Sequence, residues 1–357
     1  MKSKNTTAFN PALALYAKCV VALTFVLLFI GGLVTSYHAG MAVPDWPLSF
    51  GSLNPEGWWG NFPVRLEHGH RLFAAGIGLL IMIFCGWAFA SASTSGTVRW
   101  LTALAFVGVV VQGTFGGLRV TLETAGNLKA AMALRIVHGT TAQVELCLLV
   151  ILAALLSRGW IEGSWKFSGA SLVPVHRLAW LVVFALLAQL VAGAAMRHLG
   201  AGLAIPTFPE ANVAGSWLPT VHNKFVEINF THTRVGAIVV TLLVLALSAL
   251  VFRRADGDVR LTSPTAGLLG LLLVQLSLGV AVILHAKPVT LTTIHVINGA
   301  AILALSVLLA VRAGRFVKDS ALTAAKPLPE EARARAAPRP MSLSRSRIRA
   351  ISPSPAC

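Results

Sequence analysis

An apolar segment of the sequence begins with an acidic and a basic side chain one helical turn apart. The segment RLEHGHRLFAAGIGLL, residues 65–80, places Glu67 and His70 on one face of the helix that its apolar run predicts. Lipid offers no partner to either group, so both need partners within the protein. We therefore expect a ligand or a reactive site at this end of the helix. The alternative is a simple salt bridge from Glu67 to Arg71, four residues on.

Three other histidines lie near the ends of apolar segments, within a turn or two of the same expected membrane face. They are His138, His232 and His295. A single histidine inside a membrane usually forms a hydrogen bond between helices. Four at one depth form two pairs, and two imidazoles from facing helices supply both axial positions of a haem iron. The sequence therefore predicts haem iron held by His70, His138, His232 and His295.

Other uses of these histidines fit the sequence less well. The pairs are far apart in sequence and no cysteine joins them, which disfavours one tetrahedral zinc site. A copper site would need cysteine or methionine near the histidines. A proton pathway needs carboxylates within the membrane, and the halves supply few besides Glu67 and Glu145.

Arginines lie one to three residues from three of the histidines. Arg71, Arg135 and Arg234 could bind haem propionates through charge-assisted hydrogen bonds. They could equally extend to lipid headgroups. The sequence does not separate these two readings.

The elements that position these residues are predicted to be eight membrane-spanning helices. The chain has 357 residues, of which 56% are hydrophobic and 12% charged, with a mean hydropathy of +0.75. Apolar windows long enough to cross a bilayer recur near residues 13–35, 70–91, 99–119, 131–156, 177–197, 231–252, 265–285 and 290–311. We therefore predict an all-α membrane protein.

The two halves of the chain resemble each other. GGLVTSYHAGMAVPDWP at 31–47 matches GAAMRHLGAGLAIPTFP at 193–209 with an offset of 162, which also carries His70 onto His232. An even number of spans in each half makes the repeat parallel. We predict two pseudo-symmetric four-helix bundles, residues 1–158 and 172–312.

Residues 313–357 form a basic segment rich in Pro, Ala and Ser, which predicts a disordered cytoplasmic tail near anionic lipid. This tail holds nine of the basic residues behind the net charge of +16, so nucleic-acid binding is not expected. Cytoplasmic termini would place the four histidines on the extracytoplasmic side. Cys19, Cys85 and Cys147 fall in apolar helices and offer no loop disulfide.

The halves differ at one position that bears on chemistry. Asn229 precedes His232 where Glu67 precedes His70. A carboxylate can relay protons or stabilise positive charge as it develops, and an amide can do neither. The difference predicts a reactive first half and a second half that holds a cofactor.

Together these motifs resemble the haem A synthase family. The resemblance covers residues 12–312 and rests on GGLVTSYHAGMAVPDWPLSFG, EHGHR, RIVHGTTA, NFTHTRVGA and TIHVINGA. It implies a bacterial plasma-membrane enzyme with eight helices, which oxidises a methyl group of haem O to a formyl group and yields haem A for terminal oxidases.

The resemblance also implies roles for residues and partners. His232 and His295 would ligate a haem b cofactor, His70 and His138 would flank the substrate haem O, and Glu67 would be the essential acid. A haem O synthase that delivers the substrate, an unidentified electron donor and a homo-oligomer are possible partners. The alternatives are a di-haem b cytochrome that only transfers electrons and a transporter without haem.

Two features depart from the expected pattern. Many bacterial members carry two cysteines in the first extracytoplasmic loop, but this loop reads DWPLSFG, with Ser49 and no cysteine. A mechanism that passes electrons through a disulfide there is therefore excluded. His68 is an additional histidine, which we expect at the surface or on the propionate side, because it lies away from the helix face of Glu67 and His70.

Overall fold

Eight helices of the computed structural model are long and apolar enough to cross a membrane, and the protein is an all-α integral membrane protein. The structure describes residues 8–165 and 169–324. The spans are α1 (Pro11–Ser36), α2 (Phe62–Ala90), α3 (Gly96–Thr124), α4 (Leu128–Leu155), α6 (Val173–His198), a composite helix from Lys224 to Arg254, α9 (Val259–Leu284) and α10 (Val289–Ala324). The composite helix consists of α7 (Lys224–Phe230), a π-helical turn (Thr231–Gly236) and α8 (Ala237–Arg254). A short helix, α5 (Arg158–Ile161), follows α4.

Polar side chains mark the starts of the membrane helices. Asn10, Asn61, Ser95, Asn127 and Asn223 each accept a hydrogen bond from a backbone N–H in the first turn of the helix that follows. Such caps satisfy donors that have no partner within the helix. The boundaries of these helices therefore follow from local sequence.

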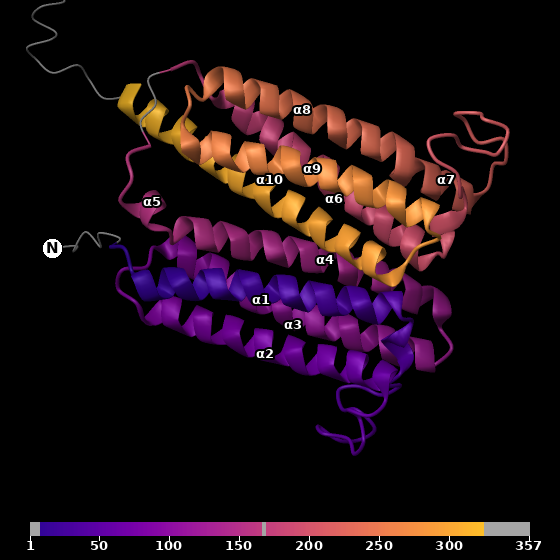
Figure 1. Cartoon of the computed structure of the whole chain (residues 1–357). Helices are drawn as coiled ribbons and strands as arrows, with labels where there is room; N and C mark the ends of the chain where they lie inside the picture. The colour runs from indigo at the N-terminus through magenta and orange to yellow at the C-terminus, as the bar shows by residue number, and fades with distance from the viewer. Residues whose placement is uncertain (1–7, 166–168, 325–357) are drawn as a thin grey trace, which may run out of the picture.

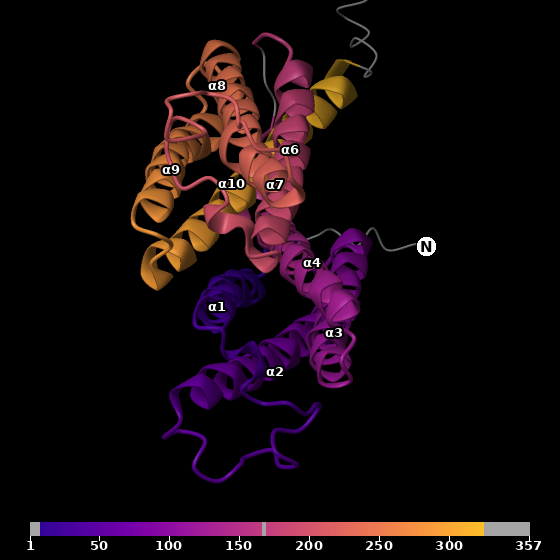
Figure 2. The ribbon, with the colours of Figure 1, turned by 90° about the vertical axis from the view of Figure 1, so that its right-hand side faces the viewer.

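The helices form two groups (Figures 1 and 2). In the first group, contacts run from α1 to α2, α3, α4 and back to α1; in the second they run from α6 to α8, α9, α10 and back to α6. Helix α10 also contacts α1 and α4, and α4 contacts α6. Histidine-bearing helices α2 and α4 are thus separated by α1 and α3 around their ring. The pseudo-symmetry of the two groups remains a prediction.

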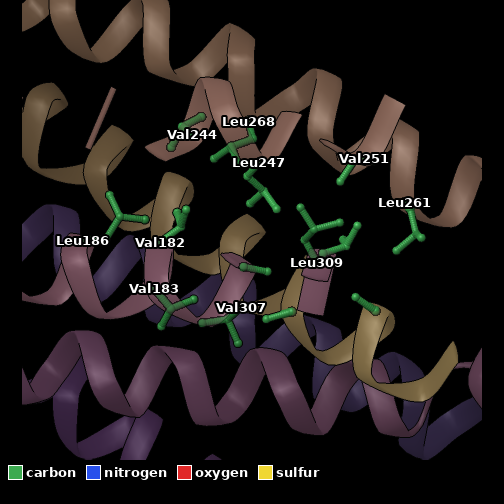
Figure 3. Close-up of a cluster of buried hydrophobic side chains, with 14 of the residues drawn as sticks. Val182, Val183, Leu186, Val244, Leu247, Val251, Leu261, Leu268, Val307 and Leu309 are labelled. Atoms are coloured by element: carbon green, nitrogen blue, oxygen red, sulfur yellow. The ribbon is translucent and has the colours of Figure 1, made fainter. Parts of the chain in front are cut away.

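Each group has an apolar interior. Val244, Leu247 and Leu268 lie in the larger cluster, which fills the second group (Figure 3). Phe84, Ile81 and neighbouring side chains fill the first. Since lipid tails are as apolar as these residues, close packing and van der Waals contact hold the interior together rather than exclusion of water.

The loops after α1 and α6 have the same backbone conformation at the 162-residue offset. His38 and Gly200 both adopt the left-handed conformation, with φ of 55° and 72°. Each is followed by a short 3-10 turn, Ala39–Met41 and Ala201–Leu203. Both loops also contain a cis proline, at Pro47 and Pro209. The local structure therefore supports the repeat read from the sequence.

Helix α10 continues beyond residue 312, where we expected the tail to begin. Ala313 and Phe316 are fully buried, and the Phe316 ring packs against Trp165 with the ring centroids 4.9 Å apart. The guanidinium of Arg260 lies 4.5 Å from the Phe316 ring. These contacts give the added turns a partner surface. The rest of the expected tail, residues 325–357, lies outside the described residues.

Candidate functional site

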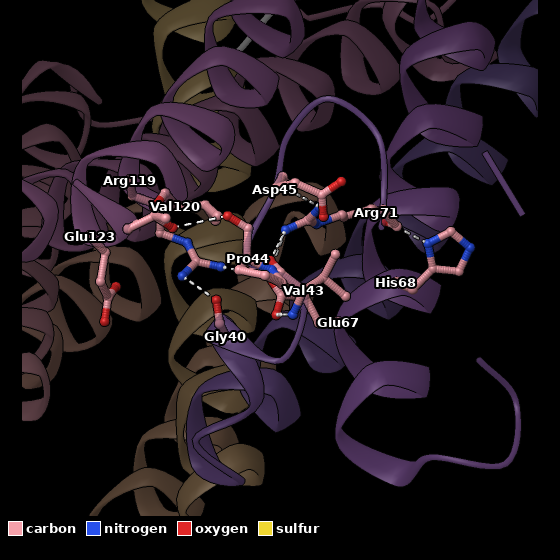
Figure 4. A network of polar contacts seen from close by, with 12 residues as sticks. Gly40, Val43, Pro44, Asp45, Glu67, His68, Arg71, Arg119, Val120 and Glu123 are labelled. Carbon is pink, nitrogen blue, oxygen red and sulfur yellow. Dashed lines mark hydrogen bonds and ion pairs between the residues drawn. The ribbon is translucent and has the colours of Figure 1, made fainter. Parts of the chain in front are cut away.

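Glu67 is the centre of a buried polar network at the end of α2 (Figure 4). Its side chain is only 1% exposed. One carboxylate oxygen accepts a hydrogen bond from the Val43 N–H at 3.0 Å, and the other lies 2.8 Å from Arg71 and 3.5 Å from Arg119. The salt bridge to Arg71 is thus present, but it is one of three contacts. Arg119, in α3, was not singled out from the sequence.

The two arginines hold the loop that follows α1. Arg71 donates to the carbonyls of Val43, Asp45 and Leu48 at 2.8, 2.7 and 3.1 Å. Arg119 donates to the Gly40 carbonyl at 2.7 Å. The loop therefore closes over the end of α2, and its position depends on both guanidinium groups.

The carboxylate of Asp45 stabilises the far side of this loop. It accepts hydrogen bonds from the N–H groups of Phe50 and Gly51, each at 2.8 Å. Desolvation acts to raise the pKa of Asp45, but the hydrogen bonds from Gly51 and Phe50 and the charge of Arg71 outweigh it. The pKa therefore lies below its ordinary value, and the charged form favours the folded loop.

His70 and His138 each press against a glycine of a neighbouring helix. A Cβ added at Gly31 or Gly116 would lie 3.1 or 3.3 Å from the Cε1 atom of His70 or His138. Only glycine leaves this room without displacement of the ring. Nδ1 of His70 is buried and has no hydrogen-bond partner, which is costly unless a ligand engages the ring.

His232 and His295 face each other in the second group. Their ring centroids are 6.5 Å apart and the ring planes lie at 76°. Nδ1 of His232 lies 3.1 Å from the Gln189 carbonyl, and Nε2 of His295 lies 3.2 Å from Nε2 of Gln275. A hydrogen bond to the second ring nitrogen orients an imidazole that binds metal through the first. Nδ1 of His295 is buried and has no hydrogen-bond partner among the described residues, so this ring has a nitrogen left for a ligand.

The same close packing on glycine occurs here. A Cβ at Gly193 would lie 2.6 Å from Cε1 of His232, and one at Gly279 would lie 3.3 Å from Cε1 of His295. Within the described residues, no group of three or more His, Cys, Asp or Glu could hold a bare metal ion. Paired imidazoles instead fit an iron whose other four ligands come from a porphyrin. The residues present therefore fit haem.

Arg234 repeats the contacts of Arg71, although the two arginines differ by 163 positions rather than 162. Arg234 donates to the carbonyls of Thr207 and Glu210 at 2.5 and 3.0 Å. These two residues match Asp45 and Leu48, which accept from Arg71. The π-helical turn Thr231–Gly236 supplies the additional residue. Such a turn widens the helix by one residue, so the histidine and the arginine can both keep their positions.

Asn229 is fully buried at the position that matches Glu67. Its amide donates to the Ala201 carbonyl at 2.8 Å. The backbone acceptor replaces the arginine partners of Glu67, so the difference in charge between the halves is accompanied by a different network.

The other cationic residues have protein partners as well. Arg135 forms a hydrogen-bonded ion pair with Glu123. Arg197, in α6, donates to the Gly32 carbonyl at 2.9 Å and to the Ser36 hydroxyl at 2.6 Å, both in α1. Arg197 was not singled out, because its acceptors belong to the other half of the chain.

Of the two positions expected for His68, the surface is wrong and the propionate side stays a prediction. His68 is 2% exposed, its Nδ1 lies 2.8 Å from the Ser49 hydroxyl, and its ring packs edge-on against Trp58 at 4.8 Å. It does point away from Glu67, as expected (Figure 4). The loop between α1 and α2 folds back over this face of α2 and covers it.

Comparison with known proteins identifies the family of this chain. The model of the family described as cytochrome oxidase assembly protein (COX15-CtaA) matches residues 61–307. A protein of Halalkalibacterium halodurans named heme A synthase is 28% identical over 224 residues, which cover 62% of this chain and 70% of that protein. Proteins of the same name from Brucella ovis and Brucella suis are each 26% identical over 261 residues, 70% of this chain and 68% of theirs. The chain therefore belongs to the cytochrome oxidase assembly protein family.

Proposed function

We propose that this protein is a haem A synthase, a membrane oxidoreductase that oxidises a methyl substituent of haem O to a formyl group. The observation that carries the proposal is the difference between two otherwise matched sites. Both hold a histidine packed on glycine and an arginine that binds the same loop carbonyls. Only the first holds a buried carboxylate, Glu67, one turn from its histidine.

The second half is the proposed cofactor site. His232 and His295 would hold haem b through its iron, which supplies redox chemistry when bound. Gln189 orients the His232 ring through its backbone carbonyl. The glycines beneath the rings let the helices approach closely.

The first half is the proposed substrate site, where His70 and His138 flank haem O. Glu67 can accept a proton or offset positive charge on the substrate, and the Val43 N–H, Arg71 and Arg119 fix its position. Arg71, Arg135 and Arg234 are the proposed cationic partners of haem propionates. Arg71 and Arg234 would bind the propionates while they keep their hydrogen bonds to the loop carbonyls.

The setting of the enzyme is also a proposal. Cytoplasmic termini would place both sites near the extracytoplasmic face of a bacterial plasma membrane. A haem O synthase would deliver the substrate, and an unidentified donor would supply electrons. The chain would contact membrane lipid and could form a homo-oligomer.

The test is to purify the protein from cells with and without a source of haem O and to separate the extracted haems by chromatography. We expect haem b under both conditions, and haem A or partly oxidised haem O only with the source. Two permanently bound haems of the same kind under both conditions would instead support a di-haem b cytochrome, which the comparisons do not favour.

A further inference from the structure

A cavity of about 480 Å³ lies between α2 and α3. Arg71 and Trp46 lie among its lining residues, and so do the small residues Ala75, Gly78 and Gly113. Met82 lines it eleven residues after Arg71, so the cavity follows α2 for about 16 Å. Leu79, Met82 and Val110 line it and are about half exposed, which shows that the cavity opens on the membrane-facing side of the helices.

The cavity shares one residue with the proposed substrate site. Arg71 lines it and is the neighbour of His70 in sequence. Trp46 and Pro47 also line it. The Trp46 indole lies so close to Gly117 in α3 that an added Cβ would overlap it at 2.2 Å. Glycine at position 117 therefore leaves room for the Trp46 side chain at this end of the cavity. The cavity is polar at the end near Arg71 and apolar along the rest of its length.

Five matching positions of the second half carry larger side chains, whereas Trp46 and Phe106 correspond to the smaller Phe208 and Leu269, and Met82 corresponds to Leu245. With the offset of 163 that relates Arg71 to Arg234, the counterparts of four lining residues and of Gly117 can be read from the sequence. Ala75, Gly78, Val109, Gly113 and Gly117 become Ile238, Thr241, Leu272, Leu276 and Val280. Ile77 and Ile81 keep their character as Val240 and Val244, and all four are buried. Four of the five larger side chains thus replace residues that line the cavity in the first half.

We propose that this groove receives the isoprenoid chain of the substrate haem. This inference rests on the proposed function, because haem O differs from haem b by such a chain. A flat polar-edged ring at the histidines and a long apolar chain in the groove would match the polar and apolar ends of the cavity. The larger residues at five matching positions would narrow the corresponding space in the second half, so the two sites would select haem O and haem b by the volume beside α2.

The test introduces second-half residues into the groove. Gly113→Leu and Ala75→Ile each add side-chain volume to the groove. A Cβ at Gly113 meets no atom within 4 Å, so the fold should tolerate leucine at this position. Gly86→Leu is the matched control, because Gly86 is also an exposed helical glycine with nothing within 4 Å of its Cβ, but it does not line the cavity. Binding of haem O and of haem b to the first-half site is measured by titration in detergent, with the second-half haem as a measure of folding.

We expect Gly113→Leu to weaken haem O binding at least tenfold, with haem b binding to the same site and the second-half haem both retained. Gly86→Leu should match the wild type. Unchanged haem O binding in Gly113→Leu, or equal loss of haem O and haem b binding, would contradict the proposal that the groove receives the isoprenoid chain. If Gly113→Leu changes only the amount of bound lipid, the proposal is also contradicted, and the cavity would instead hold a lipid acyl chain. A wild-type protein that makes no haem A contradicts the proposed function, whereas the ratio of the two affinities tests the groove separately.

Discussion

Glu67 and Asn229 occupy matching positions but have different hydrogen-bonding partners, and among the described residues the Asn229 Oδ1 accepts only from the Thr233 hydroxyl, at 3.2 Å. Glu67 accepts from the Val43 N–H and from two arginines, whereas the Asn229 amide donates to a backbone carbonyl. A carboxylate has only acceptor atoms, which suits three donors. In the proposed function, this one side chain therefore distinguishes the chemistry of the two halves.

Changing Glu67 to Gln tests whether the carboxylate of Glu67 is needed for the reaction. The amide keeps the volume of the side chain, but it cannot take up a proton and offers one acceptor oxygen instead of two. We expect normal haem b content and accumulation of haem O or a partly oxidised haem, with the rate of haem A formation reduced by about 10²-fold or more. Chromatography of extracted haems measures the result.

Glu162→Gln is the control, since Glu162 forms an exposed ion pair with Arg158. Wild-type yields of haem A from Glu67→Gln would leave Glu67 as a structural ion-pair partner only.

His232→Ala and His295→Ala should each remove the low-spin b-type spectrum of the isolated protein. Each change deletes one of the two imidazoles that face each other at 6.5 Å, and alanine supplies no ligand. His285→Ala is the control, because His285 is exposed at the end of α9. A normal spectrum in both single variants would rule out this axial pair.

At the scale of elements, arginines connect loops to helix ends. Arg71 binds three carbonyls of the first loop, and Arg234 binds two carbonyls of the second from beyond a π-helical turn. These loops, Gly40–Pro47 and Gly202–Pro209, are predicted to line the mouths of the haem pockets rather than extend into solvent.

Arg71→Lys should loosen the first loop without unfolding α2. Lysine is a compact charge that cannot span several carbonyls as the planar guanidinium does. We expect the haem-loaded wild type to resist protease at Gly40–Pro47 in right-side-out membranes and Arg71→Lys to be cleaved faster. Arg65→Lys is the control, because Arg65 is a half-buried arginine of the same helix that donates to the Trp59 carbonyl, outside Gly40–Pro47. Rapid cleavage of the haem-loaded wild type would contradict the predicted position of the loop.

At the scale of the whole molecule, two groups of helices meet through α1, α4, α6 and α10. Arg197 is a polar contact across this boundary, from α6 to Gly32 and Ser36 of α1. Gly32 itself would bring a Cβ within 3.0 Å of Thr293 in α10, so the helices are closely packed at this point.

Arg197→Ala should lower the thermal stability of the purified protein, because it removes charge-assisted hydrogen bonds that each contribute roughly 1.5–3 kcal/mol. The midpoint of heat-induced haem release in detergent measures the change. Arg177→Ala, at an exposed arginine near the start of α6, should have little effect. Equal midpoints for both variants would show that the contact across the boundary adds no stability.

The sequence by itself determined the eight helices and the difference between Glu67 and Asn229, and the shared depth of the four histidines stays a prediction from it. These features depend on local properties: apolar runs of membrane length, capping residues such as Asn61, and a repeat whose spacing is visible in the letters.

Only the tertiary structure decided which groups meet. Arg119 and Arg197 bind backbone carbonyls, which every residue carries and which therefore leave no mark in the sequence. His68 is buried because a loop folds over it, and the groove between α2 and α3 appears only where small residues of two helices face each other. Such features depend on contacts between segments that are distant in the chain, so local pattern could not predict them.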